Sequence, residues 1–189
     1  MLDLESGPVH LSVEEGVGGT SLCLSLAVTV LQSKSRVFWL GRNPLNTERT
    51  QAILAELNET QLERLFIIEF GDNLLARATA LKPLINRLTD ADLLVIDDWC
   101  PSYGRAPAND LQAVRSLISS SENTRLILTS KAYESPSGDG GKWKSRGAQL
   151  SGVRQAWLLR QEGLTNHRRI IDGEIQTRLL LKESGFVVD

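Results

Sequence analysis

Val13-Glu14-Glu15-Gly16-Val17-Gly18-Gly19-Thr20-Ser21 is the stretch of sequence that decides the fold. It follows a short apolar run, Val9–Val13, which predicts a β-strand. It precedes a helix that apolar residues at helical spacing predict from about Thr20 to Gln32. A strand, a glycine-rich turn and a helix with a hydroxyl residue in its first turn form the setting of a phosphate-binding loop. The segment therefore predicts an α/β fold organised around such a loop.

The loop departs from the usual pattern, G-x-x-x-x-G-K-[ST], at two of its fixed positions. Val13 stands in place of the first glycine and Gly19 in place of the lysine, whereas Gly18 and Thr20 match. In working loops the lysine neutralises phosphate oxygens and the hydroxyl binds Mg²⁺. The positive charge that a bound triphosphate needs is therefore missing.

Two carboxylates, those of Glu14 and Glu15, stand in the turn, where we expect them to repel a triphosphate. Two interpretations remain open. The turn is either a tight strand-to-helix connection with Thr20 as the helix cap, which we favour, or a vestigial nucleotide site. The residues of that vestigial site are Gly16, Gly18, Gly19, Thr20 and Asp97.

The first two thirds of the chain alternate between strand and helix patterns. Further strands are predicted at Arg36–Leu40, Leu65–Glu69, Leu93–Ile96 and Arg125–Thr129. Helices are predicted at Thr47–Glu59 (with Thr47 as N-cap), Asn73–Leu88 and Asp110–Ser119. Strands that alternate with helices and are apolar on both faces form parallel sheets covered by helices. The pattern therefore predicts an α/β fold with a mostly parallel sheet flanked by helices.

The last third of the chain changes character. Ser135–Gly147 is rich in Gly, Ser and Lys and is predicted to be a loop. Three β-like segments follow, at Gln155–Arg160, His167–Ile171 and Gln176–Lys182, with turns at glycines between them. We expect them to form C-terminal antiparallel β-hairpins at the edge of the sheet.

Composition sets broad limits. The 189 residues, 41% hydrophobic and 23% charged, suit one domain spanning 1–189. No apolar run approaches the roughly 18 residues of a membrane span, and the N-terminus has no signal pattern. The two cysteines share no metal-ligand spacing. We therefore expect a cytoplasmic protein with no membrane and no metal site.

Charge is distributed unevenly along the chain. Residues 1–124 hold ten Lys/Arg against sixteen Asp/Glu, whereas residues 125–189 hold eleven against seven. The net charge of −2 therefore hides an acidic part and a basic part. Such polarity favours a basic surface for nucleic acid or for an acidic partner.

The order of motifs along the whole chain resembles the RecA/RadA superfamily, and most closely its small RadB and KaiC-like members. After the loop comes the strand segment Arg36–Asn43, and Leu93–Asp97 then resembles a Walker B strand that ends in aspartate. Leu128–Tyr133, a glycine-rich loop and the terminal hairpins complete the order. The resemblance implies a RecA-like α/β fold.

Family roles carry over with losses. The resemblance places the lysine position at Gly19, the catalytic glutamate at about Asn43 and the Mg²⁺ aspartate at Asp97. The γ-phosphate sensor falls near Lys131, and the basic finger that active relatives insert into a neighbour has no clear counterpart. Loss of the lysine and the glutamate together predicts no efficient hydrolysis, so ATP and Mg²⁺ are possible but not expected cofactors.

The loop after the Arg125–Thr129 strand contacts DNA in recombinases of this superfamily. Here it holds Lys142, Trp143, Lys144 and Arg146, in which cations can meet phosphates and the indole can stack on a base. Arg154, Arg168 and Arg169 could extend the basic patch. The alternative is a solvated loop whose Trp143 packs back onto the domain.

Two weaker candidates remain. Trp99–Tyr103 is either a partner-binding surface or a segment buried over the sheet. Ser21 or Ser130 with His10 or His167 has the residue types of a hydrolase, but no G-x-S-x-G elbow and no triad spacing supports one.

These observations favour a non-catalytic RecA-fold recombinase paralogue that acts as an accessory factor in homologous recombination and DNA repair. Its expected partners are single-stranded DNA and a recombinase or another RecA-fold paralogue, in a hetero- or homo-oligomer. The alternatives are a weak divergent ATPase that uses Thr20, Asp97 and a substitute cation such as Arg42 or Lys131, and a regulatory or assembly subunit that touches only protein.

Overall fold

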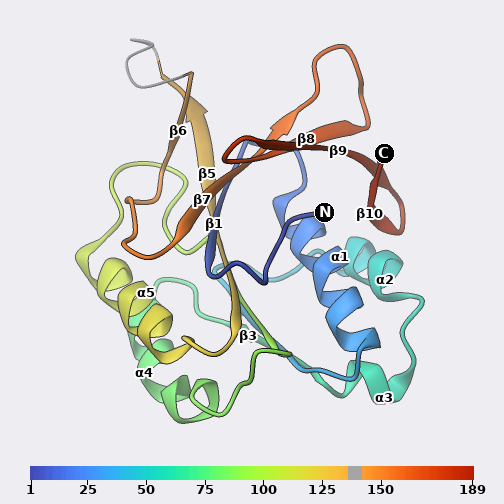
Figure 1. The fold of residues 1–189 in the computed structure, drawn as a ribbon. Coiled ribbons are helices and arrows are strands. Elements are labelled where there is room, and N and C mark those ends of the chain that lie inside the picture. Colours follow the sequence, from blue (N-terminus) through green and yellow to red (C-terminus); the bar gives the residue numbers. More distant parts are fainter. Residues whose placement is uncertain (136–141) are drawn as a thin grey trace.

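A computed structural model describes residues 1–135 and 142–189 of the chain (Figure 1). Its helices are α1 (Gly19–Gln32), α2 (Thr47–Leu54), α3 (Glu59–Leu62), α4 (Leu74–Ile85) and α5 (Ala108–Ser120). Its first strands are β1 (Val9–Val13), β2 (Val37–Gly41), β3 (Leu65–Glu69), β4 (Leu93–Asp97) and β5 (Arg125–Glu134). The later strands are β6 (Trp143–Ser145), β7 (Arg154–Arg160), β8 (His167–Asp172), β9 (Ile175–Lys182) and β10 (Gly185–Val188).

One sheet joins these strands in the order β10-β9-β8-β7-β1-β5-β4-β2-β3, and β6 pairs with β5 off this path. The pairs among β1 to β5 and β7 on the path are parallel, whereas β8, β9 and β10 follow as an antiparallel series. The predicted mostly parallel sheet with C-terminal antiparallel hairpins is therefore confirmed.

Helices cover both faces of the parallel strands (Figure 1). On one face α1 and α2 pack against alternate residues of β1, β2, β4 and β5 in one apolar cluster, which also includes residues of β7 to β10. On the other face α4 and α5 pack against the intervening residues in a second cluster, which includes no residue of β7 to β10. Because both faces are covered, every residue of β1, β2 and β4 is buried, and this is the physical reason why β2 and the Leu93–Ile96 part of β4 are apolar.

Two sequence predictions in the middle of the chain need correction. The predicted helix Thr47–Glu59 is two helices, α2 and α3, and its N-cap is Asn46, whose side chain accepts a hydrogen bond from the Arg49 N–H. Asn58 caps α3 in a reciprocal capping box with Gln61. A capping residue inside an apparently continuous helical pattern starts a second helix, and this signal was overlooked.

The C-terminal third also contains more strand than predicted. β5 continues to Glu134, five residues beyond its predicted end, and β6 pairs with it inside the predicted loop Ser135–Gly147. β10 adds a further hairpin that was not predicted. The paired part of the predicted loop is therefore an antiparallel β-ribbon that extends from the sheet (Figure 1).

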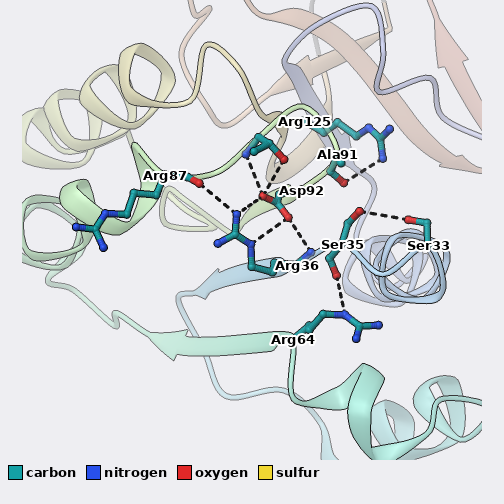
Figure 2. Close-up of polar contacts among 9 residues, drawn as sticks. Ser33, Ser35, Arg36, Arg64, Arg87, Ala91, Asp92 and Arg125 are labelled. Carbon is teal, nitrogen blue, oxygen red and sulfur yellow. Dashed lines mark hydrogen bonds and ion pairs between the residues drawn. The ribbon is translucent and has the colours of Figure 1, made fainter.

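An ion pair between a partly exposed guanidinium and a buried carboxylate lies at the amino ends of the parallel strands, opposite the phosphate loop. Figure 2 shows Arg36 facing Asp92, with a guanidinium-to-carboxylate distance of 2.7 Å. Burial alone raises the pKa of Asp92, but hydrogen bonds from Arg36 and Thr89 hold that pKa below its usual range. The pair joins the start of β2 to the start of β4.

Over the ranges that the structure describes, no helix is long and apolar enough to cross a membrane. Within the same ranges no three His, Cys, Asp or Glu side chains are grouped to hold a metal ion. Both cysteines, Cys23 and Cys100, are free and buried.

Candidate functional site

The phosphate-loop segment folds as a strand, a turn and a helix. Gly18 is the N-cap of α1 and has a left-handed backbone conformation, with φ of 95°, which favours glycine. The expectation that Thr20 caps this helix is wrong, because no side chain makes a capping hydrogen bond at its N-terminus. The Thr20 hydroxyl is used elsewhere.

The two departures from the loop pattern lie against each other. A Cβ atom at Gly19 would be 2.7 Å from Cγ2 of Val13 and 2.9 Å from its Cγ1. Those distances are closer than non-bonded carbons approach, so any residue larger than glycine at position 19 would require the Val13 side chain or the backbone to shift. The missing lysine and the missing first glycine are therefore one coupled change in packing.

The retained polar residues of the site bind each other. The Thr20 hydroxyl donates to Oδ2 of Asp97 over 2.9 Å, and the Thr129 hydroxyl donates to Oδ1 of the same carboxylate over 2.7 Å. Burial, together with the nearby Asp98, raises the pKa of Asp97 against the effect of these two hydrogen bonds. Both carboxylate oxygens that would face a hydrated Mg²⁺ thus already accept hydrogen bonds.

One of the two carboxylates in the turn has a partner. Glu14 accepts a hydrogen bond of 2.7 Å from the Arg160 backbone N–H and lies 3.4 Å from the Arg160 guanidinium. Glu15 is exposed. The β7 end therefore ties the loop to the sheet through Glu14, which holds this carboxylate toward Arg160.

Two adjoining hollows lie at the carboxyl ends of the parallel strands. The first, of about 160 Å³, is lined by the phosphate loop together with Asp97, Asp98, Thr129 and Lys131. The second, of about 270 Å³, shares Thr20, Ser21, Asp97 and Asp98 with the first and continues past Asn43 to α2. This edge is where open α/β sheets bind ligands.

The cations near these hollows are already paired. Lys131 lines the smaller hollow, where its ammonium lies 3.4 Å from Asp98. Arg49 lines the larger one and donates to the Ser21 hydroxyl and to two backbone carbonyls of the β9–β10 turn. Arg42 lines neither hollow, because it forms a 2.6 Å ion pair with Asp110 and donates to the backbone oxygens of Asp98 and Trp99.

A magnesium nucleotide, which the RecA-like fold implies, fits these residues poorly. Val13 occupies the space in which a lysine at position 19 would begin. Asp97 is bound by two hydroxyls, and the one cation in the smaller hollow faces Asp98. Asn43, at the position of the catalytic glutamate, carries no carboxylate to activate water. We therefore assign no step of a reaction to this site.

The predicted DNA-contact residues lie on the β5–β6 ribbon. Lys144 pairs with Tyr133, and the Arg146 N–H donates to the Lys131 carbonyl, so these four side chains project from one face of the ribbon. The Arg146 guanidinium lies 4.1 Å from the centroid of the Tyr133 ring, a cation–π contact. We call Lys131, Tyr133, Lys144 and Arg146 the basic ribbon face.

Trp143 lies on the opposite face of the ribbon, because it pairs with Glu134. Lys142 forms a 3.2 Å ion pair with Glu134, and its ammonium lies 5.9 Å from the Trp143 ring centroid. The Trp143 side chain is half-buried, and its indole N–H has no hydrogen-bond partner among the residues that the structure describes. Strand alternation therefore separates Trp143 from Lys144 and Arg146.

The structure brings none of the three arginines proposed to extend the patch onto this face. Arg154 lies at the amino end of β7, which is the end of the sheet opposite the ribbon. Its guanidinium is within 4 Å of carboxylate oxygens of Asp3 and Asp172. Arg168 is buried and donates to the Val17 carbonyl beneath the phosphate loop. Arg169 points to the other side of the sheet from Arg168.

Sequence reasoning did not single out two residues near the basic ribbon face, Arg105 and Tyr133. Both line a hollow of about 340 Å³, beside Arg146, between this face and the segment that leads into α5. Tyr103, from the same segment, is 78% exposed. The alternation of Lys131 with Tyr133 and of Lys144 with Arg146 was the available signal, but it is visible only when both segments are recognised as strands.

The two weaker candidates are also resolved by burial. Trp99 and Cys100 are buried, so the interpretation of a segment buried over the sheet is correct for these two residues, whereas Tyr103 is exposed. The Ser130 hydroxyl lies 2.8 Å from Nε2 of His10, but both residues are fully buried, and Nδ1 of His10 has no hydrogen-bond partner in the described ranges. A catalytic serine would need an accessible hydroxyl and a group to orient the histidine.

No protein-family model matches the sequence, and no curated protein matches it either. Solved structures do match. The crystal structure of the RadB recombinase superposes with a TM-score of 0.70 at 15% identity, over 96% of this chain and 90% of that one. A DnaB-like replicative helicase, from a structure on its interactions with primase, superposes with a TM-score of 0.61 at 11% identity, over 97% of this chain.

The two likenesses differ in extent. The chain spans nearly the whole length of the RadB chain but only 57% of the helicase chain. At these identities the likeness concerns the path of the backbone. Together with the strand order and the position of the loop, it shows that the chain has a RecA-like α/β fold.

Proposed function

We propose that the protein is a non-hydrolysing RecA-fold accessory factor that binds single-stranded DNA and a recombinase or another RecA-fold paralogue. Its role would lie in homologous recombination and DNA repair. In this proposal the phosphate loop is retained for packing, and surfaces carry the function. The recombinase named among the structural neighbours agrees with this role.

The contact between Val13 and Gly19 supports the loss of hydrolysis more strongly than the missing lysine alone. A single substitution could remove a lysine and leave the site otherwise usable. Here the Val13 side chain fills the space beside position 19, so a lysine there would also require Val13 to shift or to be replaced. This contact supports a loop that serves as part of the core.

The basic ribbon face supports DNA binding. It presents Lys144, Arg146 and Tyr133 on one partly exposed side of the ribbon, beside Lys131, which pairs with Asp98, and Arg146 stacks on Tyr133. Cations of this kind contact phosphates, and aromatic rings and guanidinium planes stack on bases. The hollow that Arg105 lines next to this face offers space for one base.

Titration of labelled oligothymidylate at several salt concentrations tests the proposal. We expect the wild-type protein to bind, and Lys144→Ala/Arg146→Ala to lower the slope of log K against log salt by about 1.4, since each lost phosphate contact contributes about 0.7. Lys82→Ala/Arg87→Ala, at exposed positions on α4 and just after its end, removes the same charges and should leave the slope unchanged. Equal slopes for both variants would contradict the proposed surface.

Nucleotide binding is measured separately. Calorimetric titration with magnesium and ATP should release no binding heat, and phosphate release should equal that of a Thr20→Ala variant. Micromolar affinity together with Thr20-dependent turnover would support the weak ATPase instead.

A further inference from the structure

Strand alternation divides the side chains of β7, β8 and β9 into two sets that differ in burial. One set points toward α1 and is buried at its centre. It includes Ala156, Leu158, Ile170 and Leu179, each at most 2% exposed. The other set points to the opposite side of the sheet, where α4 and α5 cover β2, β4 and β5 but contribute no cluster with β7, β8 or β9. This second side is left without a covering helix (Figure 1).

We call the cationic and the partly exposed large apolar members of this second set the open face, namely Trp157, Arg169, Ile171, Arg178, Leu180 and Lys182; Gln155, His167 and Gln176 point to the same side. Each of these side chains is partly or fully exposed. Leu159 is the one buried side chain that β7 contributes to this side. An exposed, regular sheet surface that mixes apolar and cationic side chains is typical of a binding surface.

Over the described ranges none of the three cations of the open face is paired, whereas His167, on the same side of the sheet, lies 3.6 Å from the Asp189 carboxylate. Arg169 and Arg178 lie directly opposite each other on neighbouring strands. Like charges in that position destabilise a sheet. Over the described ranges neither guanidinium makes a hydrogen bond or an ion pair, and Nε of Arg169 is buried without a partner. Folding alone does not favour this arrangement, whereas an anion placed between the two guanidiniums would stabilise it.

We infer that the open face binds single-stranded nucleic acid, with phosphates on Arg169, Arg178 and Lys182 and a base stacked on Trp157. An antiparallel sheet that presents an aromatic ring between cations is a platform on which unpaired bases stack. The spacing of neighbouring strands, about 4.8 Å, lets adjacent cations meet successive phosphates. An acidic protein segment would satisfy the arginines, but it would not need the exposed indole.

The open face is distinct from the basic ribbon face, although Trp143 points to its side of the sheet. Ser12 pairs with both Ser130 and Trp157, so these three side chains point to one side of the sheet. Alternation along β5 puts Glu134 on the same side as Ser130, and Trp143 pairs with Glu134. The two partly exposed indoles therefore lie on one side of the sheet, while Trp39 and Trp99 are fully buried. The inference rests on the proposed function in one respect, namely that the protein binds single strands.

Fluorescence of the full-length Trp143→Phe variant tests the inference. In this variant Trp157 is the remaining accessible indole, so stacking of a base on it should quench emission when oligothymidylate of about 20 nucleotides is added. Removal of two phosphate contacts by Arg169→Ala/Arg178→Ala should weaken affinity roughly tenfold at low salt and lower the salt slope by about 1.4. Arg77→Ala/Arg87→Ala, at exposed positions on α4 and just after its end, removes equal charge and should neither weaken affinity nor lower the salt slope.

The outcomes separate the two proposals. Loss of affinity in Arg169→Ala/Arg178→Ala, with quenching of Trp157, supports the open face whether or not Lys144→Ala/Arg146→Ala has an effect. Wild-type affinity in Arg169→Ala/Arg178→Ala, beside a loss in Lys144→Ala/Arg146→Ala, overturns the inference and leaves the proposed function intact. Reduced affinity of Arg169→Ala/Arg178→Ala without quenching of Trp157 overturns the part of the inference that stacks a base on Trp157. Absence of any binding by the wild-type protein overturns both.

Discussion

The phosphate loop and the β5–β6 ribbon lie at the same end of the sheet but use their polar groups in opposite ways. In the loop, Thr20 and Thr129 donate to Asp97, Glu14 is held by Arg160, and Val13 fills the space beside Gly19. In the ribbon, Lys144 and Arg146 project from a partly exposed face. The comparison teaches that a fold can keep the backbone of a phosphate loop while the polar side chains of that loop bind one another. Polar side chains that are free to bind a ligand can then lie on an added element, here the ribbon.

The ribbon is anchored to β1 through His10, where we expect the largest measurable effect. The Trp99 indole N–H donates to Nε2 of His10, Ser130 lies 2.8 Å from the same atom, and Gly147 packs on the ring. Burial lowers the pKa of His10 to about 4. Between the ordinary pKa near 6.5 and this value the unfolded chain binds a proton that the folded protein does not. Stability is therefore complete above about pH 6.5 and falls as the pH decreases toward 4, by roughly 3 kcal/mol.

Chemical denaturation at a series of pH values measures this effect. His10→Gln removes the titrating group, and His167→Gln is the matched control on β8. We expect the dependence of the unfolding free energy between pH 6.5 and 4 to become shallower in His10→Gln alone. An unchanged pH dependence of the unfolding free energy in His10→Gln would show that other groups cause the acid sensitivity, and it would contradict the role of His10 in anchoring the ribbon.

A second prediction concerns the packing of Val13 against Gly19 in the phosphate loop. Gly19→Lys places a Cβ 2.7 Å from Val13 and should lower the unfolding free energy by about 1–3 kcal/mol, the usual cost of overpacking. Val13→Gly/Gly19→Lys removes the clash and should recover part of that loss. Thermal melting distinguishes them, and Val13→Gly alone gives the cost of the cavity. No difference in melting temperature between the single lysine variant and the double variant would refute the coupled change.

Much of the fold was predictable because it follows from local pattern. The apolar run of β4 and the glycine turn before α1 each specify an element, and their order specified the sheet. The site was less predictable, because it depends on contacts between distant segments. Residue types indicate that position 19 lacks lysine, but only the packing of β1 on α1 shows that Val13 excludes it. Likewise Trp143 and Lys144 are neighbours in sequence, and only the pairing of β6 with β5 shows that they face opposite ways.

A third prediction concerns that separation in the ribbon. Because Trp143 is half-buried and lies opposite Lys144, we expect Trp143→Ala to weaken oligothymidylate binding about 5-fold, near 1 kcal/mol, the lower end of the range for stacking. The salt slope should stay the same, since no cation is removed. A larger loss of melting temperature than of affinity would identify Trp143 as a packing residue of the ribbon.

The smallest effect is expected in the loop itself, at Thr20. Its hydroxyl makes one hydrogen bond, to a carboxylate that Thr129 also binds, so Thr20→Ala removes one of two donors and leaves Asp97 with a partner. A typical buried hydrogen bond contributes about 1 kcal/mol, and we expect a loss of unfolding free energy of that size. Thr20→Val is the matched control, because it keeps the shape and removes the same donor. If the Thr20 hydroxyl serves only to bind Asp97, both variants lose similar stability and neither changes oligothymidylate affinity. A defect in DNA binding that appears only when ATP and Mg²⁺ are present would show instead that the loop still binds a nucleotide.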